Sequence, residues 1–127
     1  VILSAAVADY KPKVQFDTKV KKKSSSLEIE LVKTKDIAAE LGSLKKKQVI
    51  VGFALETNDE LNNAKEKLEK KNFDFIVLNS LSDNGAGFGH DTNKVTFVNR
   101  NGIIPFELKS KSKVAHDITN EIIKYIE

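Results

Sequence analysis

One carboxylate and a group of lysines are the residues in this sequence whose types and spacing could do chemistry. Asp9 follows an apolar run, and a lysine-rich stretch extends from Tyr10 to Ser26. The lysines of that stretch are Lys11, Lys13, Lys19, Lys21, Lys22 and Lys23. Ammonium groups around a carboxylate suit a nucleoside triphosphate, with Mg²⁺ shielding part of the phosphate charge. Phosphoryl or acyl transfer can then proceed by positioning and charge neutralisation, without a nucleophile from the protein.

Each of these features also has a purely structural interpretation. Asp9 could cap the turn that leads to Pro12. The lysine stretch could be a solvated connection instead of a flap that closes over an anionic ligand. Lys67 and Lys71 lie one turn apart on a predicted helix, where they could serve solubility or contact an anion. The position one turn before Lys67 is Asn63, so an ion pair at that spacing does not explain the lysine, although Glu66 and Glu69 could still compensate its charge.

Composition excludes several function classes. The net charge of +3 is the difference between 21 cations and 18 anions, Arg100 is the single arginine, and tryptophan is absent. Nucleic-acid binding is disfavoured, because it relies on arginine forks and aromatic platforms. Cysteine is absent and the histidines are His90 and His116, which disfavours a zinc enzyme. No apolar run approaches the roughly 20 residues of a membrane span, and no signal peptide is evident, so we expect a cytoplasmic protein.

Buried strands must position the reactive groups. Apolar runs at 1–8, 49–55 and 75–79 predict strands buried on both faces of a parallel sheet. The carboxyl ends of such strands meet at one edge, where open α/β sheets bind ligands. Gly52, inside the second run, indicates close approach of another backbone or of a ligand.

Helices and further strands complete the predicted fold. The predicted helices run from a Thr34 N-cap to Leu44, from a Thr57–Glu60 capping box to Lys71, and from a Ser112 N-cap to Ile126. Their predicted buried residues are Ile37, Ala38 and Leu41, then Leu61, Ala64 and Leu68, then Val114, Ile118, Ile122 and Tyr125. Residues 27–32 alternate as a half-exposed strand does, and Asn101-Gly102 indicates an antiparallel hairpin between 94–99 and 103–108.

These elements predict one α/β domain over residues 1–127. It would have three layers and a Rossmann-like or ribokinase-like, mostly parallel sheet that ends in a C-terminal antiparallel hairpin. The glycine-rich segment 84–91 lacks the spacing of a dinucleotide fingerprint and precedes a strand instead of a helix. We therefore predict a loop there.

A series of motifs, in order and with their spacing kept, resembles one enzyme family over nearly the whole chain. The motifs are AAVADY at 5–10, KVKK at 19–22, KTKDI at 33–37, VGFALET at 51–57, NFDFIVLN at 72–79 and FGHDTN at 88–93, with Lys67 and Lys71 between the fourth and the fifth. They are similar to phosphopantothenoylcysteine synthetase, the ligase of coenzyme A biosynthesis. Lys35 stands where that family has a proline.

The resemblance implies a reaction and its components. The carboxylate of 4′-phosphopantothenate would attack the α-phosphate of CTP (ATP in eukaryotic members), and the amine of cysteine would then displace the nucleotide. It also implies Mg²⁺, with Asp9 as a tentative ligand, and a homodimer that binds neither nucleic acid nor membrane. FMN would belong only to a fused decarboxylase domain. Lys19 would be catalytic, neutralising the phosphates and covering the acyl intermediate. The nucleotide-binding residues implied are Leu3, Ser4, Ala5, Asp9, Lys19, Lys35, Asp36, Ile37, Ala38, Phe53, Lys67 and Lys71.

Two further expectations concern completeness and the alternative function. The chain has no methionine and begins inside a predicted strand, and the family's preceding glycine-rich loop and first strand–helix unit are missing. We therefore expect a fragment that holds part of a site and does not turn over alone. The alternative function is a noncatalytic nucleotide-binding or oligomerisation module, with surface lysines and a hairpin that contacts another copy.

Overall fold

The computed structural model describes residues 1–21, 25–80 and 89–127. Contacts divide the chain into two compact units. The larger unit comprises Val1–Ser4 and Ala38–Glu127, and the smaller comprises Ala5–Ile37. Each unit has its own sheet, and the two are taken in turn.

A five-stranded sheet forms the centre of the larger unit. In spatial order its strands are β1 (Ile2–Leu3), β4 (Val51–Glu56), β5 (Phe75–Ser80), β7 (Val95–Asn99) and β8 (Gly102–Pro105). The first three are parallel, and β7 and β8 continue the sheet as an antiparallel hairpin. The register places Glu56 beside Ser80, so β4 and β5 end at the same edge. The hairpin at Asn101-Gly102 is confirmed, since Asn99 and Gly102 are partners.

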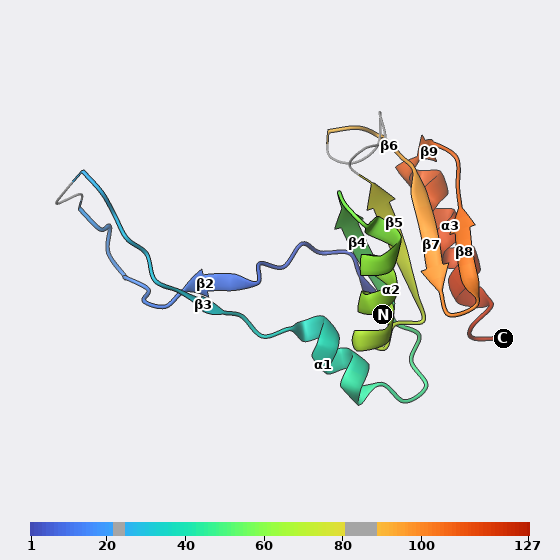
Figure 1. Ribbon diagram of the computed structural model, residues 1–127, viewed down its shortest axis with the longest axis horizontal. Coiled ribbons are helices and arrows are strands. Elements are labelled where there is room, and N and C mark those ends of the chain that lie inside the picture. Colours follow the sequence, from blue (N-terminus) through green and yellow to red (C-terminus); the bar gives the residue numbers. More distant parts are fainter. Residues whose placement is uncertain (22–24, 81–88) are drawn as a thin grey trace. The chain divides into compact units, whose positions relative to one another are not determined.

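Helices cover both faces of this sheet, which confirms the predicted three layers (Figure 1). α1 (Ile37–Leu44) and α2 (Glu60–Lys70) pack on one face, where Ala64 and Leu68 join the buried core. α3 (Lys111–Ile123) packs on the other face through Val114 and Ile118. A small antiparallel pair, β6 (Thr92–Asn93) with β9 (Lys109–Ser110), precedes α3.

Gly52 marks a close approach, as predicted, but its neighbour is a side chain. A Cβ at this position would overlap the ring of Phe73, which is 4% exposed. The contact packs the segment before β5 against β4. A buried aromatic ring, and not a backbone or a ligand, therefore explains the glycine.

The first strand is shorter and more exposed than predicted. β1 covers two residues, Ile2 is 51% exposed, and Val7 is 59% exposed. Among the described strands β1 pairs with β4 alone, so it lies at an edge and is not buried on both faces. The predicted strand over 1–8 was therefore wrong beyond Leu3, although Leu3 itself packs against the core.

All three predicted helix starts need correction. α1 begins at Ile37, and the Thr34 hydroxyl instead donates to the Ala8 carbonyl at 2.6 Å. α2 begins at Glu60, and its N-cap is Asp59, which has a left-handed backbone and makes no side-chain capping hydrogen bond. The predicted Thr57–Glu60 capping box is therefore wrong. α3 is capped by Ser110, whose Oγ accepts from the Lys113 N–H at 3.3 Å, and not by Ser112. In each case the sequence offered a capping residue close to the helix start, but the helix begins at a different residue.

The predicted buried faces are largely correct. Exceptions are Ile37, Leu61 and Tyr125, which are 49%, 41% and 38% exposed. Tyr125 lies beyond the end of α3, yet its ring stacks on Phe75 with centroids 5.8 Å apart. The apolar pattern therefore identified the core side of each helix but extended it too far at the ends.

The smaller unit is a two-stranded antiparallel ribbon with its connecting segment. β2 (Tyr10–Pro12) pairs with β3 (Leu31–Lys33), and Lys13 forms an ion pair of 2.7 Å with Glu30. The half-exposed strand predicted at 27–32 was wrong in extent. Leu27 and Ile29 are 72% and 60% exposed, because no layer within this unit covers them.

Two predicted features fall outside the described residues. They are Lys22 and Lys23 of the lysine stretch, and residues 84–88 of the glycine-rich segment, which include Phe88 of the FGHDTN motif. Within the described part of the chain, no helix is long and apolar enough to cross a membrane.

Candidate functional site at the carboxyl ends of the strands

Polar side chains gather where β4 and β5 end and α2 begins. We call them the carboxyl-edge cluster: Glu56, Glu60, Asn63, Lys67, Asn79, Ser80 and Asn93. The cluster lies at the edge where α/β sheets bind ligands, since β4 and β5 are parallel and end in register. Successive residues of a strand face opposite ways. Glu56 and Ser80 therefore face α2 together, beyond the apolar residues Ala54 and Leu78 of the same face.

Glu56 and Lys67 form the central contact of the cluster. Lys67 Nζ lies 2.5 Å from Glu56 Oε1, and Asn63 Nδ2 donates to Glu56 Oε2 at 3.3 Å. The glutamate side chain is 14% exposed and the lysine side chain 44% exposed. The glutamate side chain is thus mostly buried, while the lysine side chain is partly exposed. An anion at the strand ends could therefore contact the Lys67 ammonium while Glu56 holds it in place.

Two further contacts fix the neighbouring groups. Ser80 Oγ donates to Glu60 Oε1 at 2.6 Å, which links the end of β5 to the first turn of α2. On the opposite face, Asn93 Nδ2 donates to Asn79 Oδ1 at 3.1 Å. Asn93 belongs to the FGHDTN motif, so the described part of that motif does reach the strand ends.

The structure brings only some of the implied nucleotide residues of the larger unit together. Phe53 packs against the α3-side core, because it lies on the face of β4 opposite Glu56 and hence opposite Lys67. Lys71 follows α2 one turn beyond Lys67, towards the amino ends of the strands. Leu3 and Ala38 are partly buried against the α2-side core, and Ser4 is exposed at the end of β1.

The smaller unit carries the other implied residues. Asp9 and Lys19 are exposed, and within the described residues of this unit neither side chain has a hydrogen bond or an ion pair. The backbone carbonyl of Asp9 accepts from the Thr34 N–H at 2.9 Å, which joins the AAVADY and KTKDI motifs. Also exposed are Ala5, Lys35, Asp36 and Ile37. That these residues and Lys67 share one nucleotide stays a prediction.

The described residues contain no ready-made metal centre. No group of three or more His, Cys, Asp or Glu side chains among them could hold a metal ion. Mg²⁺ usually keeps several waters and binds through one or two carboxylates together with substrate phosphates. A magnesium ion at Asp9, arriving with the nucleotide, therefore stays a prediction.

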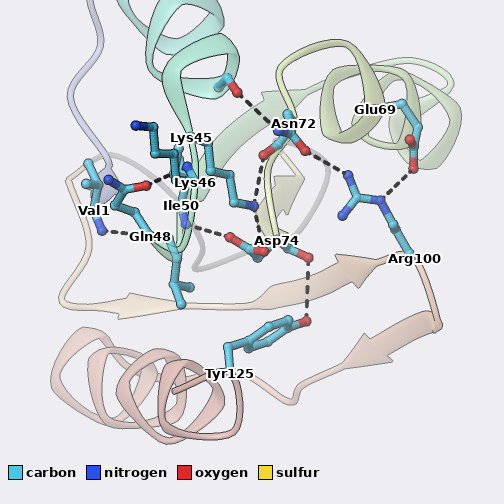
Figure 2. Close-up of polar contacts among 12 residues, drawn as sticks. Val1, Lys45, Lys46, Gln48, Ile50, Glu69, Asn72, Asp74, Arg100 and Tyr125 are labelled. Carbon is cyan, nitrogen blue, oxygen red and sulfur yellow. Dashed lines mark hydrogen bonds and ion pairs between the residues drawn. The ribbon is translucent and has the colours of Figure 1, made fainter. Parts of the chain in front are cut away.

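A second polar network lies at the amino ends of the strands and has a structural explanation. Figure 2 shows it centred on Asp74, which accepts from Lys45 Nζ and from the Ile50 N–H, both at 2.7 Å. Arg100 bridges Asn72 at 3.2 Å and Glu69 at 3.4 Å. The contacts join the α1–β4 and α2–β5 connections and the β7–β8 turn, and they involve buried or neutralised groups. This edge is opposite the carboxyl-edge cluster, and we assign it to stability.

Burial and a neighbouring charge perturb one phenol at this amino-terminal edge. Partial burial raises the pKa of Tyr125, and the nearby Glu121 carboxylate raises it further. Its hydroxyl donates to the Asp74 carbonyl at 3.5 Å. The neutral phenol is therefore the form that the fold favours.

Glu56 is the functional candidate that the sequence pattern did not reveal. It stands in the VGFALET motif as the last residue of β4, and it partners a lysine 11 residues later. Spacing along the helix relates Lys67 to Asn63, Glu66 or Glu69 and does not indicate Glu56. A strand-end carboxylate followed by an antiparallel helix with a lysine in its second half is the signal that could have found the pair.

Residues 1–126 match the family described as the DNA/pantothenate metabolism flavoprotein C-terminal domain. A protein of an unidentified prokaryote named cysteine/cysteine sulfinic acid decarboxylase is 55% identical over 98% of this chain and 35% of its own length. The coenzyme A biosynthesis bifunctional protein CoaBC of Bacillus subtilis is 48% identical over 96% of this chain and 30% of its own length. The chain thus spans about a third of these curated relatives.

A solved structure supports the fold assignment. The crystal structure of the C-terminal domain of a coenzyme A biosynthesis bifunctional protein CoaBC superposes with a TM-score of 0.71 at 36% identity. The match covers 94% of this chain and 50% of that one.

Proposed function

The chain belongs to the DNA/pantothenate metabolism flavoprotein C-terminal domain family, and on that premise we propose that it forms part of a CTP-dependent phosphopantothenate–cysteine ligase. The 48% identity to a coenzyme A biosynthesis bifunctional protein supports this assignment. The motifs shared with phosphopantothenoylcysteine synthetases support it independently.

The proposed reaction has two steps. A carboxylate oxygen of 4′-phosphopantothenate attacks the α-phosphorus of CTP, the bond to the β-phosphate breaks, and pyrophosphate leaves. The amine of cysteine then attacks the acyl carbon of the acyl-cytidylate, loses a proton, and displaces CMP to leave an amide. Charge builds on the phosphate oxygens in the first step, so cations placed there stabilise the transition state.

The observation that carries the proposal is the placement of Lys67. Its ammonium lies at the strand ends, partly exposed and anchored by Glu56. An ammonium has three N–H donors, so the contact with Glu56 leaves others for phosphate oxygens. Lys19 of the KVKK motif would supply the second cation, from the flap. When bound, Mg²⁺ would shield the phosphates, with Asp9 as the one carboxylate proposed to face it.

The decarboxylase name of the 55% identical relative does not change this proposal. It describes a protein of which this chain spans 35%, and we assign no decarboxylation to these residues. FMN would accordingly belong to a separate domain.

A binding experiment tests the proposed function. Thermal unfolding of the complete polypeptide that carries this chain is followed with CTP, ATP or heparin, each with magnesium. We expect CTP to raise the midpoint at concentrations where ATP and heparin do not. Equal responses to all three would indicate nonspecific charge, and no response to either nucleotide would contradict the ligase assignment.

A further inference from the structure

We propose that Glu56 is a positioning residue for the nucleotide: it holds the Lys67 ammonium at the carboxyl ends of the strands, ready for phosphate oxygens. The inference rests on the proposed function, because it takes Lys67 as a nucleotide contact. It adds a residue that touches no substrate and acts through the lysine.

The geometry around Glu56 restrains its carboxylate on both oxygens. Oε1 contacts Lys67 Nζ at 2.5 Å, and Oε2 accepts from Asn63 Nδ2 at 3.3 Å. Asn63 is itself held, since its Nδ2 also donates to the Asn58 carbonyl at 2.9 Å. Glu56 is also the last residue of β4, which pairs with β5 along its whole length. A carboxylate fixed in this way is a rigid anchor.

Lys67 needs such an anchor because its side chain is long. A free lysine spreads its ammonium over many rotamers, and ordering it on binding lowers affinity. The lysine stands in the second half of α2, so its side chain must reach along the helix to the strand ends. Contact with Glu56 fixes the position of the Lys67 ammonium before any ligand binds.

The exposure of the two side chains is compatible with this role. The lysine is 44% exposed while its partner is 14% exposed. Compare Lys45 and Asp74 at the opposite edge, where both side chains are mostly buried and saturated by backbone contacts. Lys124 and Glu121 show a similar asymmetry, at 66% and 9% exposed, so the position of the Glu56–Lys67 pair at the strand ends, and not its asymmetry alone, carries the inference.

A simple charge argument predicts the opposite effect on binding. If Glu56 acted only as a negative charge, its removal would strengthen the attraction between Lys67 and phosphate. If it acts by positioning, its removal weakens binding in spite of the lost repulsion. The sign of the change therefore distinguishes the two roles.

The test measures the dissociation constant of magnesium CTP by calorimetry on the complete polypeptide that carries this chain. We expect Glu56→Gln, which keeps the size and an oxygen for Asn63, to weaken binding about fivefold. In a Lys67→Ala background the same substitution should no longer weaken binding, and relief of the repulsion between Glu56 and phosphate could only strengthen it, because the residue that Glu56 positions is gone. Glu66→Gln, an equal charge change on an exposed side chain of α2, is the matched control and should leave affinity unchanged.

The outcomes distinguish failure of the positioning role from failure of the proposed function. If Glu56→Gln leaves the affinity for CTP unchanged or improves it, the positioning role is overturned and the proposed function is not. A loss of equal size in the Lys67→Ala background also overturns the positioning role, because Glu56 would then act on the fold. A wild-type protein that binds no CTP overturns the proposed function and this inference together. Glu56→Asp, whose carboxylate is one methylene shorter but keeps its charge, should show a partial loss and guards against misfolding of the glutamine variant.

Discussion

Lys45 and Asp74 form an ion pair of 2.7 Å whose side chains are 11% and 16% exposed. The aspartate precedes β5 and the lysine follows α1, so the pair fastens two loops at the amino ends of the strands. The second carboxylate oxygen of Asp74 accepts from the N–H of Ile50, just before β4. The pair thus fastens the amino-terminal edge of the sheet, opposite the edge where Glu56 holds Lys67.

Removing Asp74 should be strongly destabilising. Asp74→Ala leaves a mostly buried ammonium without its carboxylate and the Ile50 N–H without its side-chain acceptor, so we expect a loss of about 3 kcal/mol in the free energy of unfolding. Urea denaturation measures it. Glu66→Ala, at an exposed carboxylate of α2, should stay within about 0.5 kcal/mol. Similar losses in the two variants would contradict the assigned role.

Gly52→Ala should lower stability through the ring of Phe73. The added methyl overlaps the ring, and overpacking of this kind costs about 1–3 kcal/mol. Because one steric conflict is responsible, combining Gly52→Ala with Phe73→Leu should cost less than the sum of the two single substitutions. Thermal unfolding of the four proteins completes the cycle, and strict additivity would show that the two residues do not interact.

The two serines at the start of α3 offer a matched pair. Ser110→Ala removes the oxygen that accepts from the Lys113 N–H and should cost about 1 kcal/mol of stability. In Ser112 the described hydrogen bond uses the backbone carbonyl, so Ser112→Ala should be near neutral. Chemical denaturation of both variants checks the order. A larger loss at Ser112 would restore the cap that the sequence pattern suggested.

Tyr125 should make alkaline stability depend on pH. Its pKa is raised from the ordinary 10.0, mainly by burial, so the folded state holds the phenolic proton more tightly than the unfolded state. The contribution of Tyr125 to the free energy of unfolding is therefore fully present below pH 10, and it is lost as the pH rises through the raised pKa of the folded state. Tyr10→Phe leaves Tyr125 as the sole tyrosine, whose absorbance reports its titration. A folded-state midpoint at or below that of the urea-unfolded chain would be inconsistent with burial.

Sequence patterns predicted the layers well because they record which side of an element is buried. Continuous apolar runs located β4 and β5, and the Asn101-Gly102 turn located the hairpin. The patterns failed for β1 and for residues 27–32. An apolar side chain such as Leu27 carries no information about whether a second layer covers it within its own unit.

The candidate site was only partly predictable, for a different physical reason. Motifs pointed to Lys67, but its partner Glu56 is set by the antiparallel return of α2 along β4, which is a tertiary relationship. The same strand geometry places Phe53 on the opposite face from Lys67. Local spacing describes a helix or a strand by itself and does not show which faces of the two will meet.

Lys19→Ala should separate turnover from affinity in the complete polypeptide. An ammonium that stabilises charge building at phosphorus acts mainly in the transition state, so kcat should fall about a hundredfold or more while CTP affinity changes little. A coupled pyrophosphate-release assay and calorimetry supply the two numbers. Lys21→Ala, in the same exposed segment, is the matched control. Equal losses of turnover and affinity would contradict a catalytic role for Lys19.

A crystal structure of the complete polypeptide with CTP and magnesium tests the central claim most directly, because it shows whether one triphosphate contacts both units. We predict that its phosphate oxygens lie within hydrogen-bonding distance of Lys67 and Lys19, with Glu56 still in contact with Lys67. A nucleotide bound away from the carboxyl ends of β4 and β5, with Lys67 directed elsewhere, would contradict the account.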